Sequence, residues 1–275
     1  MVASTDLLVE GRHFRREWSS AYDVGRRAAA QNLADIAAMG AVPTALLVGL
    51  AAPPSLPVEW ADGFADGLTD ECALVGAAVV GGDVVASDVL TIAVTALGDL
   101  DGRPPVTRAG ARVGDAVALA GRLGYSAAGL AVLRTGDPKL VDRHAEVVAA
   151  YRRPAPPYAA GPLFGEIGAT AMIDVSDGLL ADLGHVAAAS GWRIEVHSGW
   201  LLVDPPVRGA AADLGHDPLE WVLTGGEDHA LVSTVPADVV LAPGVLRIGW
   251  VTEGSGVGVV GPVPDGLAGG FDHFR

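Results

Sequence analysis

Short apolar stretches alternate with segments of helical periodicity along most of this 275-residue chain. Runs such as TALLVGLA (44–51) and LTIAVTALG (90–98) have the length and the β-branched or leucine content of buried strands. Helices that alternate with buried strands are typical of sheets covered by helices, so the sequence predicts an α/β or α+β fold. We expect a short strand-like piece at 4–11 and strands at 44–51, 77–83, 90–98, 116–121, 170–176, 192–198, 229–235 and 246–251. We expect helices at 23–39, 58–76, 126–136, 139–151 and 178–190.

One segment separates these elements into two groups. Residues 101–115 (DGRPPVTRAGARVGD) combine glycine, proline and charge and have no periodicity, which is typical of a linker. The chain is long enough for two domains of ordinary size. We therefore predict an N-terminal domain at 1–107 and a C-terminal domain at 108–275.

Single residues predict where some elements begin and end. Asp23 is suited to cap the helix at 23–39, and Gly40 is suited to end it in the left-handed conformation. AAVVGGD (77–83) reads as a short strand that runs into a glycine turn, and Gly191 ends the last predicted helix.

Charge and cysteine content exclude several classes of partner. The net charge is −15 and Lys139 is the only lysine, so no basic patch for nucleic acid or anionic membrane is expected. Residues 36–58 carry no charge but contain four prolines, which argues against a membrane-spanning helix. Charged residues interrupt any apolar run within 1–20, so no signal peptide is predicted. The single cysteine, Cys72, fits a reducing cytoplasm.

Several common catalytic motifs are missing from the sequence. There is no G-x-x-x-x-G-K-[ST], so no P-loop lysine serves a nucleotide. The absence of H-E-x-x-H and of a cysteine cluster disfavours zinc. No G-x-S-x-G nucleophile elbow occurs, which disfavours a serine hydrolase of that type.

Aspartates instead stand at the ends of apolar elements, beside glycine or alanine. Asp174, Asp177 and Asp182 lie within MIDVSDGLLADLGHV (172–186), where an isolated buried carboxylate would be costly. Carboxylates suit Mg²⁺, which proteins hold with one or two of them together with substrate phosphates. The pattern therefore predicts several Mg²⁺ ions around a polyphosphate. The same setting holds for Asp6, Asp35 and Asp83.

Each of these residues also has an ordinary structural interpretation. Asp35 alone could be a solvated helix residue, Asp177 could cap the helix that follows it, and Asp83 could lie in a plain hairpin turn. GGED (225–228) could be a simple loop, and His13 could be a surface histidine. The joint pattern, rather than any single residue, favours metal and phosphate.

Taken in order along nearly the whole chain, the motifs resemble the thiamine-monophosphate kinase family. This family belongs to a superfamily with aminoimidazole ribonucleotide synthetase and selenophosphate synthetase. The combination of MIDVSDGL with VEGRHF is specific to the kinase branch. The matching segments are TDLLVEGRHF (5–14), AAQNLADIAAMGAVP (29–43), GGD (81–83), RAGARVGDAVALAGRLGYSAAGL (108–130), MIDVSDGLLADLGHVAAASG (172–191), TGGEDHALV (224–232) and GFDHF (270–274).

The resemblance implies Mg²⁺-dependent transfer of a phosphoryl group from ATP to thiamine monophosphate, forming thiamine diphosphate. It implies an N-terminal mixed sheet with helices that dimerises through its sheet, and a C-terminal α/β domain. Phosphoryl transfer would centre on Asp35, Asp174 and Asp177. Mg²⁺ would be bound by Ser4, Thr5, Asp6, Asp35, Asp83, Asp174 and Asp177; ATP by Gly82, Asp83, Arg108 and Ser176; and the thiamine phosphate by His13, Glu227 and Phe271.

Family members usually begin with a further segment that carries a Gly-Asp-Asp motif and a first strand. This sequence starts at Met1, just before ASTDLLVEG, so we expect one metal-binding aspartate fewer and a short N-terminal sheet. Two other functions stay open. One is another ATP-dependent reaction of the superfamily, such as that of aminoimidazole ribonucleotide synthetase, and the other is nucleotide binding without catalysis. Selenophosphate synthesis is disfavoured, because no cysteine lies in an N-terminal glycine-rich loop.

Overall fold

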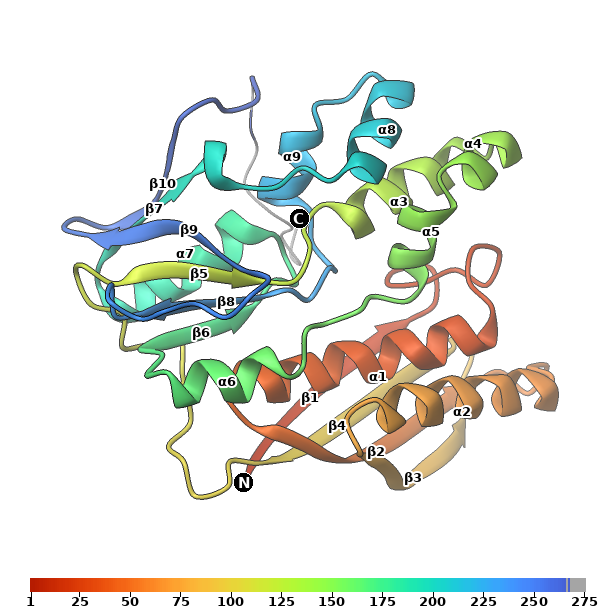
Figure 1. Ribbon diagram of the computed structural model, residues 1–275. Helices are drawn as coiled ribbons and strands as arrows, with labels where there is room; N and C mark the ends of the chain where they lie inside the picture. Colours follow the sequence, from red (N-terminus) through yellow and green to blue (C-terminus); the bar gives the residue numbers. More distant parts are fainter. Residues whose placement is uncertain (266, 268–275) are drawn as a thin grey trace.

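The computed structural model of the protein describes residues 1–265 and 267, which form two α/β domains, each built on one sheet (Figure 1). The N-terminal sheet has the order β1-β4-β2-β3, and only its β2–β3 pair is parallel. It is therefore a mixed sheet, as predicted. Its elements are β1 (Val2–Val9), α1 (Ala21–Ala38), β2 (Val42–Ala52), α2 (Val58–Ala73), β3 (Ala78–Ala86) and β4 (Thr91–Asp99).

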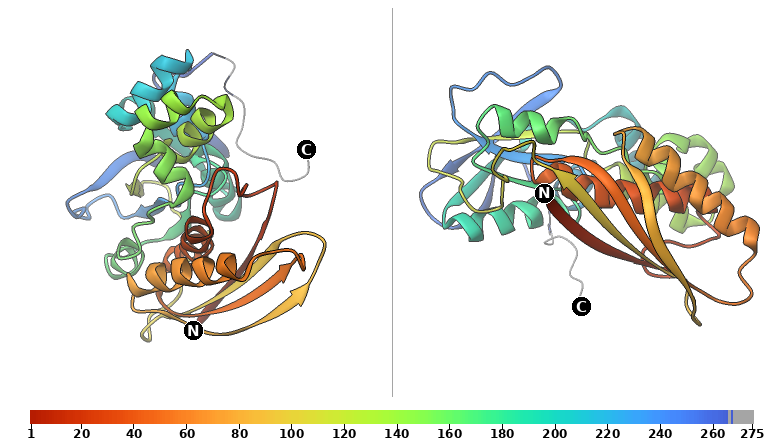
Figure 2. Two further views of the ribbon diagram at one scale, coloured as in Figure 1. Left: turned by 90° about the vertical axis from the view of Figure 1, so that its right-hand side faces the viewer. Right: turned by 90° about the horizontal axis from the view of Figure 1, so that it is seen from below.

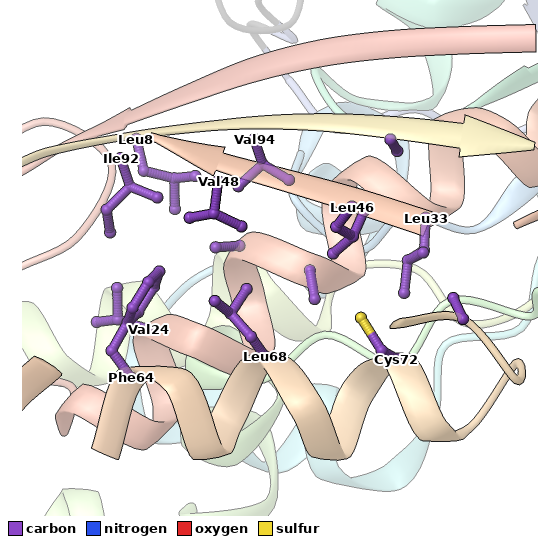
Figure 3. Packing of buried hydrophobic residues seen from close by; sticks show 14 of the residues in the cluster. Leu8, Val24, Leu33, Leu46, Val48, Phe64, Leu68, Cys72, Ile92 and Val94 are labelled. Atoms are coloured by element: carbon purple, nitrogen blue, oxygen red, sulfur yellow. The ribbon is translucent and has the colours of Figure 1, made fainter. Parts of the chain in front are cut away.

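Helices α1 and α2 cover one face of this sheet, and the opposite face lies on the outside of the molecule (Figure 2). Side chains alternate between the two faces of a strand. Leu46 and Val48 of β2 therefore point toward the helices, where they pack in one buried cluster with Val24, Phe64 and Leu68 (Figure 3). This burial fixes which face of β1 and β2 is turned toward the interior.

The C-terminal domain contains a six-stranded sheet with the order β10-β7-β9-β5-β8-β6. Its β10–β7 pair is parallel, and its other pairs are antiparallel. The strands are β5 (Ala116–Ala120), β6 (Ala171–Asp174), β7 (Arg193–His197), β8 (Leu231–Val235), β9 (Val245–Thr252) and β10 (Gly256–Val260). The helices are α3 (Tyr125–Thr135), α4 (Pro138–Arg143), α5 (Ala145–Arg152), α6 (Ala160–Glu166), α7 (Leu179–Ser190), the 3₁₀ turn η1 (Ser198–Trp200), α8 (Pro205–Leu214) and α9 (Pro218–Thr224).

Some predicted element ends were wrong. Helix α1 is capped by Ser20, and Asp23 completes the capping box three residues later, so Asp23 is not the cap itself. Gly40 follows the helix with a φ of +75°, as predicted. The predicted helix at 139–151 is two helices that are separated at His144. The predicted glycine turn after 77–83 does not exist, because β3 continues through these residues to Ala86.

The C-terminal end of α1, in the N-terminal domain, packs against the C-terminal domain. Ala37 and Ala38 pack in one buried cluster with Phe164 of α6 and Met172 of β6. A Cβ on Gly161 would lie 2.1 Å from the Ala37 carbonyl oxygen, so only glycine allows this approach. The contact places α1 beside the end of β6 (Figure 1). Among the described residues, no helix is both long and apolar enough to cross a membrane.

Candidate active site

An acidic cavity of about 650 Å³ lies where the two domains meet. Strand β1 contributes Ser4 and Asp6, which share one face of the strand, α1 contributes Asp35, and the end of β6 contributes Asp174. The Ser4 hydroxyl donates to Asp35 Oδ2 at 2.6 Å. The Gln31 amide donates to Asp6 Oδ2 at 3.1 Å. The cavity therefore gathers three carboxylates from elements that are far apart in the sequence.

Burial and the neighbouring carboxylates both disfavour the charged form of Asp35 in this cavity. Burial, followed by the nearby charges of Asp174 and Asp6, raises the pKa of Asp35 to about 7, although the Ser4 hydrogen bond opposes the rise. A cation placed here would relieve that repulsion. The donors are all oxygens, which is the ligand set that Mg²⁺ prefers. The site thus fits a Mg²⁺ ion on the chemistry of its own residues.

Asp174 is held by a histidine that our sequence reasoning did not select. The Asp174 Oδ2 and the His229 Nδ1 lie 3.0 Å apart, and both side chains are more than 90% buried. Burial alone would lower the pKa of His229. The hydrogen bond to Asp174 and its charge, with smaller contributions from Glu227 and Asp35, outweigh burial and raise that pKa to about 9.

The turn between β6 and α7 is organised by Asp182. Its Oδ2 accepts the backbone N–H groups of Ser176, Asp177 and Gly178 at 3.0, 3.0 and 3.1 Å. Burial and the nearby Asp174 charge raise the pKa of Asp182 to about 7, although the backbone hydrogen bonds oppose the rise. One ligand atom from each of Asp177, Asp182 and His185 lies within 4.8 Å of the others. Asp182, which we grouped with the metal-binding carboxylates, has a structural use, because it accepts these three backbone hydrogen bonds.

Backbone hydrogen bonds join the loop before β8 to this turn. The Glu227 and His229 amides donate to the carbonyl oxygens of Ser176 and Val175 at 2.8 and 2.9 Å. A Cβ on Gly226 would lie 2.2 Å from the Ser176 oxygen, so the two backbones touch. Glu227 and His229 have φ values of +67° and +50°, which are strained for residues other than glycine. Such strain clusters at functional sites.

Asp228 anchors the same loop to the start of α3. Its two carboxylate oxygens accept the Gly124 amide at 2.6 Å and the Ser126 amide at 2.8 Å. Burial raises the pKa of Asp228 to about 6, against the effect of these bonds. The Ser126 hydroxyl also donates to the Glu227 carbonyl oxygen at 2.7 Å. GGED is therefore not a simple loop, because each of its acidic side chains has a fixed partner.

A second cavity of about 270 Å³ lies on the other side of the turn. Arg27 donates from Nη2 to Glu227 Oε2 at 2.5 Å, and its guanidinium lies over the Tyr151 ring, 4.8 Å from the centroid. Burial opposes ionisation of Glu227, but the Arg27 charge holds the pKa of Glu227 below its usual range. Trp18 meets Tyr151 edge to face at a centroid distance of 6.3 Å. The His13 Nδ1 accepts the Val9 amide at 2.9 Å, which orients that ring.

Most of the predicted site residues line one of these two cavities. The acidic cavity takes Ser4, Asp6, Asp35, Arg108, Asp174 and Ser176, and the second takes His13, Ser176, Asp177 and Glu227. Ser176 thus lines both cavities, so they meet at the turn that carries Asp177.

Three predicted residues, Thr5, Gly82 and Asp83, do not line the acidic cavity. Thr5 points to the outer face of the sheet, where its hydroxyl accepts from Thr95 at 3.1 Å. Gly82 and Asp83 lie on β3, at the opposite edge of the sheet from β1. Three strand spacings correspond to roughly 14 Å. Phe271 lies outside the described residues.

Comparisons with known proteins cover almost the same span as the two domains. Residues 1–100 match the family model "AIR synthase related protein, N-terminal domain", and residues 112–264 match "AIR synthase related protein, C-terminal domain". The predicted boundary between residues 107 and 108 falls between the two matches and stays a prediction.

Curated relatives and a solved structure agree with these matches. The thiamine-monophosphate kinase of Mycobacterium tuberculosis is 48% identical over 254 residues, which cover 92% of this chain and 73% of that protein. Its counterpart from Corynebacterium glutamicum is 44% identical over 255 residues, covering 92% and 76%. The structure of the Aquifex aeolicus protein AaThiL, complexed with AMPPCP and TMP, superposes with a TM-score of 0.89 at 33% identity, covering 99% of this chain and 86% of that one.

Proposed function

Because this chain belongs to the thiamine-monophosphate kinase family, we propose that it transfers the γ-phosphoryl group of ATP to thiamine monophosphate, forming thiamine diphosphate and ADP. One observation of this structure carries the proposal. An oxygen-lined acidic cavity and an aromatic cavity with arginines meet at Ser176, on either side of one ordered turn. The first suits a metal-bound polyphosphate, and the second suits a phosphate ester that carries an organic ring.

We assign the metal site to the acidic cavity. Asp6, Asp35 and Asp174, with Ser4 beside them, would hold Mg²⁺, and Asp177 would do so at the junction of the two cavities. When bound, the ions neutralise phosphate charge and stabilise the phosphoryl group during its transfer. The raised pKa of Asp35 supports this assignment, because burial and the nearby Asp174 and Asp6 carboxylates disfavour the ionised form and a bound cation would favour it.

The acceptor's chemistry sets what the protein itself must do. A phosphate monoester is already anionic, so the reaction needs no strong general base. Two unit charges 4 Å apart still repel by about 4 kcal/mol at an effective dielectric near 20. Bringing the two phosphates together is therefore the difficult step, and holding them in line supplies much of the acceleration.

Each cavity offers residues for that task. Arg108 and Ser176 would contact the nucleotide, and His13 and Glu227 would orient the thiamine phosphate. Phe271 keeps its predicted contact with the substrate as a proposal from family resemblance alone. Cys72 is buried and is the chain's only cysteine, which supports a cytoplasmic protein.

We also propose a homodimer that forms through the outer face of the N-terminal sheet. Leu7, Leu47 and Val85 lie on this uncovered face with 57%, 42% and 52% of their surfaces exposed. Contiguous apolar surface of this kind marks interaction sites on soluble proteins. Gly82 and Asp83, which do not line the cavity of their own subunit, would then contact nucleotide that is bound by the second subunit.

³¹P NMR of the protein with ATP, Mg²⁺ and thiamine monophosphate tests the activity. We expect the monophosphate signal to decline while the diphosphate signals of thiamine diphosphate and ADP grow. Asp177→Ala should abolish this conversion and keep the circular dichroism spectrum of the wild type. Tight ATP binding without conversion in the wild-type protein would instead indicate nucleotide binding without this activity.

A further inference from the structure

The linker between β4 and β5 carries Arg108 on irregular backbone. Residues 100–115 form neither a helix nor a strand, and the exposed Arg108 side chain lines the acidic cavity. Among the described residues, the Arg108 guanidinium forms no ion pair or hydrogen bond. Ordering an irregular segment costs conformational entropy. The position of this side chain therefore depends on the contacts that hold its backbone.

Backbone hydrogen bonds hold the linker just before Arg108. The Val106 amide donates to the Met39 carbonyl oxygen at 3.0 Å, which attaches the linker to the end of α1. The Thr107 carbonyl oxygen accepts the Met172 amide at 3.0 Å, which attaches it to β6, the edge strand of its sheet. Neither bond involves Arg108 itself or the residues that follow it.

Ser190, the last residue of α7, holds the linker from Arg108 onward. Its hydroxyl donates to the Arg108 carbonyl oxygen and accepts from the Gly110 and Ala111 amides, each at 3.2 Å. Within the part of the chain that the structure describes, no other side chain from outside the linker bonds to this stretch. A Cβ on Gly110 would lie 2.3 Å from the Thr170 carbonyl oxygen, so the linker backbone packs directly against the residue before β6.

Resting on the kinase activity proposed above, and on the nucleotide contact of Arg108 within it, we propose that Ser190 is a positioning residue for phosphate binding. Its three hydrogen bonds order the linker before the nucleotide arrives, so that the Arg108 guanidinium is already beside the phosphates. Without them, binding would have to order that backbone first, and this cost would lower the affinity. The placement matters because, among the described residues, Arg108 is the only arginine or lysine that lines the acidic cavity.

The surroundings of this contact suit positioning rather than stability. Arg108 and Gly110 are exposed, so water can satisfy their backbone groups when the hydroxyl is removed. Alanine is a better helix former than serine, so Ser190→Ala should keep α7 intact. We expect a thermal unfolding midpoint within about 4 °C of that of the wild type.

Equilibrium titration with a fluorescent, non-hydrolysable ATP analogue and Mg²⁺ measures nucleotide binding without turnover. We expect Ser190→Ala to raise the Kd roughly fivefold, as the cost of ordering about one residue would. Arg108→Ala should raise it roughly tenfold or more, as loss of a charge-assisted hydrogen bond does. The double variant should bind no more weakly than Arg108→Ala, because Ser190 acts through Arg108. Ser255→Ala, in an exposed turn of the same domain, is the matched control and should bind like the wild type.

Steady-state kinetics should show the same selectivity. Ser190→Ala should raise the KM for ATP and leave the KM for thiamine monophosphate unchanged, because neither Ser190 nor Arg108 lines the second cavity. A wild-type Kd for the nucleotide in Ser190→Ala or in Arg108→Ala would overturn the proposal. So would additive effects in the double variant, since a loss that is independent of Arg108 would show a role in the fold alone. Nucleotide binding without conversion by the wild-type protein would refute only the kinase activity.

Discussion

At the scale of single residues, the sequence indicates the carboxylates that line the acidic cavity but not the residues that contact them. Asp6, Asp35 and Asp174 each stand in an apolar element, and an apolar setting for a carboxylate is visible in the sequence. The structure brings all three to one cavity, and the metal-binding role predicted for them stays a prediction. His229 was missed because its importance comes from a tertiary contact with Asp174, 55 residues away. The signal that could have drawn attention to it was its place directly after GGED.

Asp35→Asn tests the charge balance of the cavity. Burial raises the pKa of Asp35 from 3.8 to about 7 in the folded protein without metal. Protonation of Asp35 therefore stabilises the fold fully below pH 3.8, and this contribution is lost as the pH rises toward 7. The asparagine variant keeps this contribution at every pH. The free energy of unfolding of the variant should therefore exceed that of the wild type by an amount that grows as the pH rises from 3.8 to 7.

Urea unfolding in EDTA at pH 5 and pH 8 measures this difference, which should be on the order of a few kcal/mol at the higher pH. With saturating Mg²⁺ and nucleotide the order should reverse, because the variant lacks a metal ligand. An equal difference in the free energy of unfolding at pH 5 and pH 8 would show that burial does not raise the pKa of Asp35.

At the scale of elements, apolar runs predicted where most strands lie, and two glycines led to a wrong prediction of a turn within one strand. The stretch at 44–51 lies within β2, as its composition predicts. Gly81 and Gly82 predicted a turn, yet they lie in β3, where a Cβ on Gly82 would lie 2.0 Å from the Val48 carbonyl oxygen. Glycine is needed there for a close backbone approach rather than for a turn. Helices α6, α8 and α9 and strand β10 were not predicted.

The turn between β6 and α7 gives a prediction at this scale. Asp182→Ala leaves three backbone N–H groups without their acceptor and should destabilise the fold by roughly 2–4 kcal/mol. Displacement of Asp177 should also lower kcat roughly 10- to 100-fold. Asp142→Ala, at an exposed helical aspartate, is the matched control and should match the wild type in both measurements. Unaltered kcat in Asp182→Ala would show that the turn does not position Asp177.

At the scale of the whole molecule, the sequence predicts a two-domain chain, and the structure places a site between the domains. The alternation of helices and strands was sufficient for the fold class. The relative position of α1 and β6 was not predictable, because it depends on the fit of Ala37 against Gly161. The dimer stays a proposal, argued from the uncovered face of the N-terminal sheet.

Leu47→Arg tests the proposed dimer. Leu47 lies on the second strand from the edge of the sheet, on its outer face, so an arginine there would bury an unpaired charge in the interface. We expect a monomer by size-exclusion chromatography with light scattering, and a loss of most kinase activity. Val240→Arg, at a position in the other domain that is 89% exposed, should leave both properties unchanged. A Leu47→Arg protein with the mass of the wild type would contradict the proposed interface.

A crystal structure of the protein with Mn²⁺, a non-hydrolysable ATP analogue and thiamine monophosphate tests the proposed placement of metal, nucleotide and acceptor in the two cavities. Anomalous scattering locates Mn²⁺, which accepts the same oxygen ligands as Mg²⁺. We expect Mn²⁺ peaks bound by Asp6, Asp35 and Asp174, with phosphates between them and the turn at Asp177, and the thiamine ring in the cavity with Tyr151. Metal bound only by Asp177, Asp182 and His185, or thiamine monophosphate seated in the acidic cavity, would contradict it.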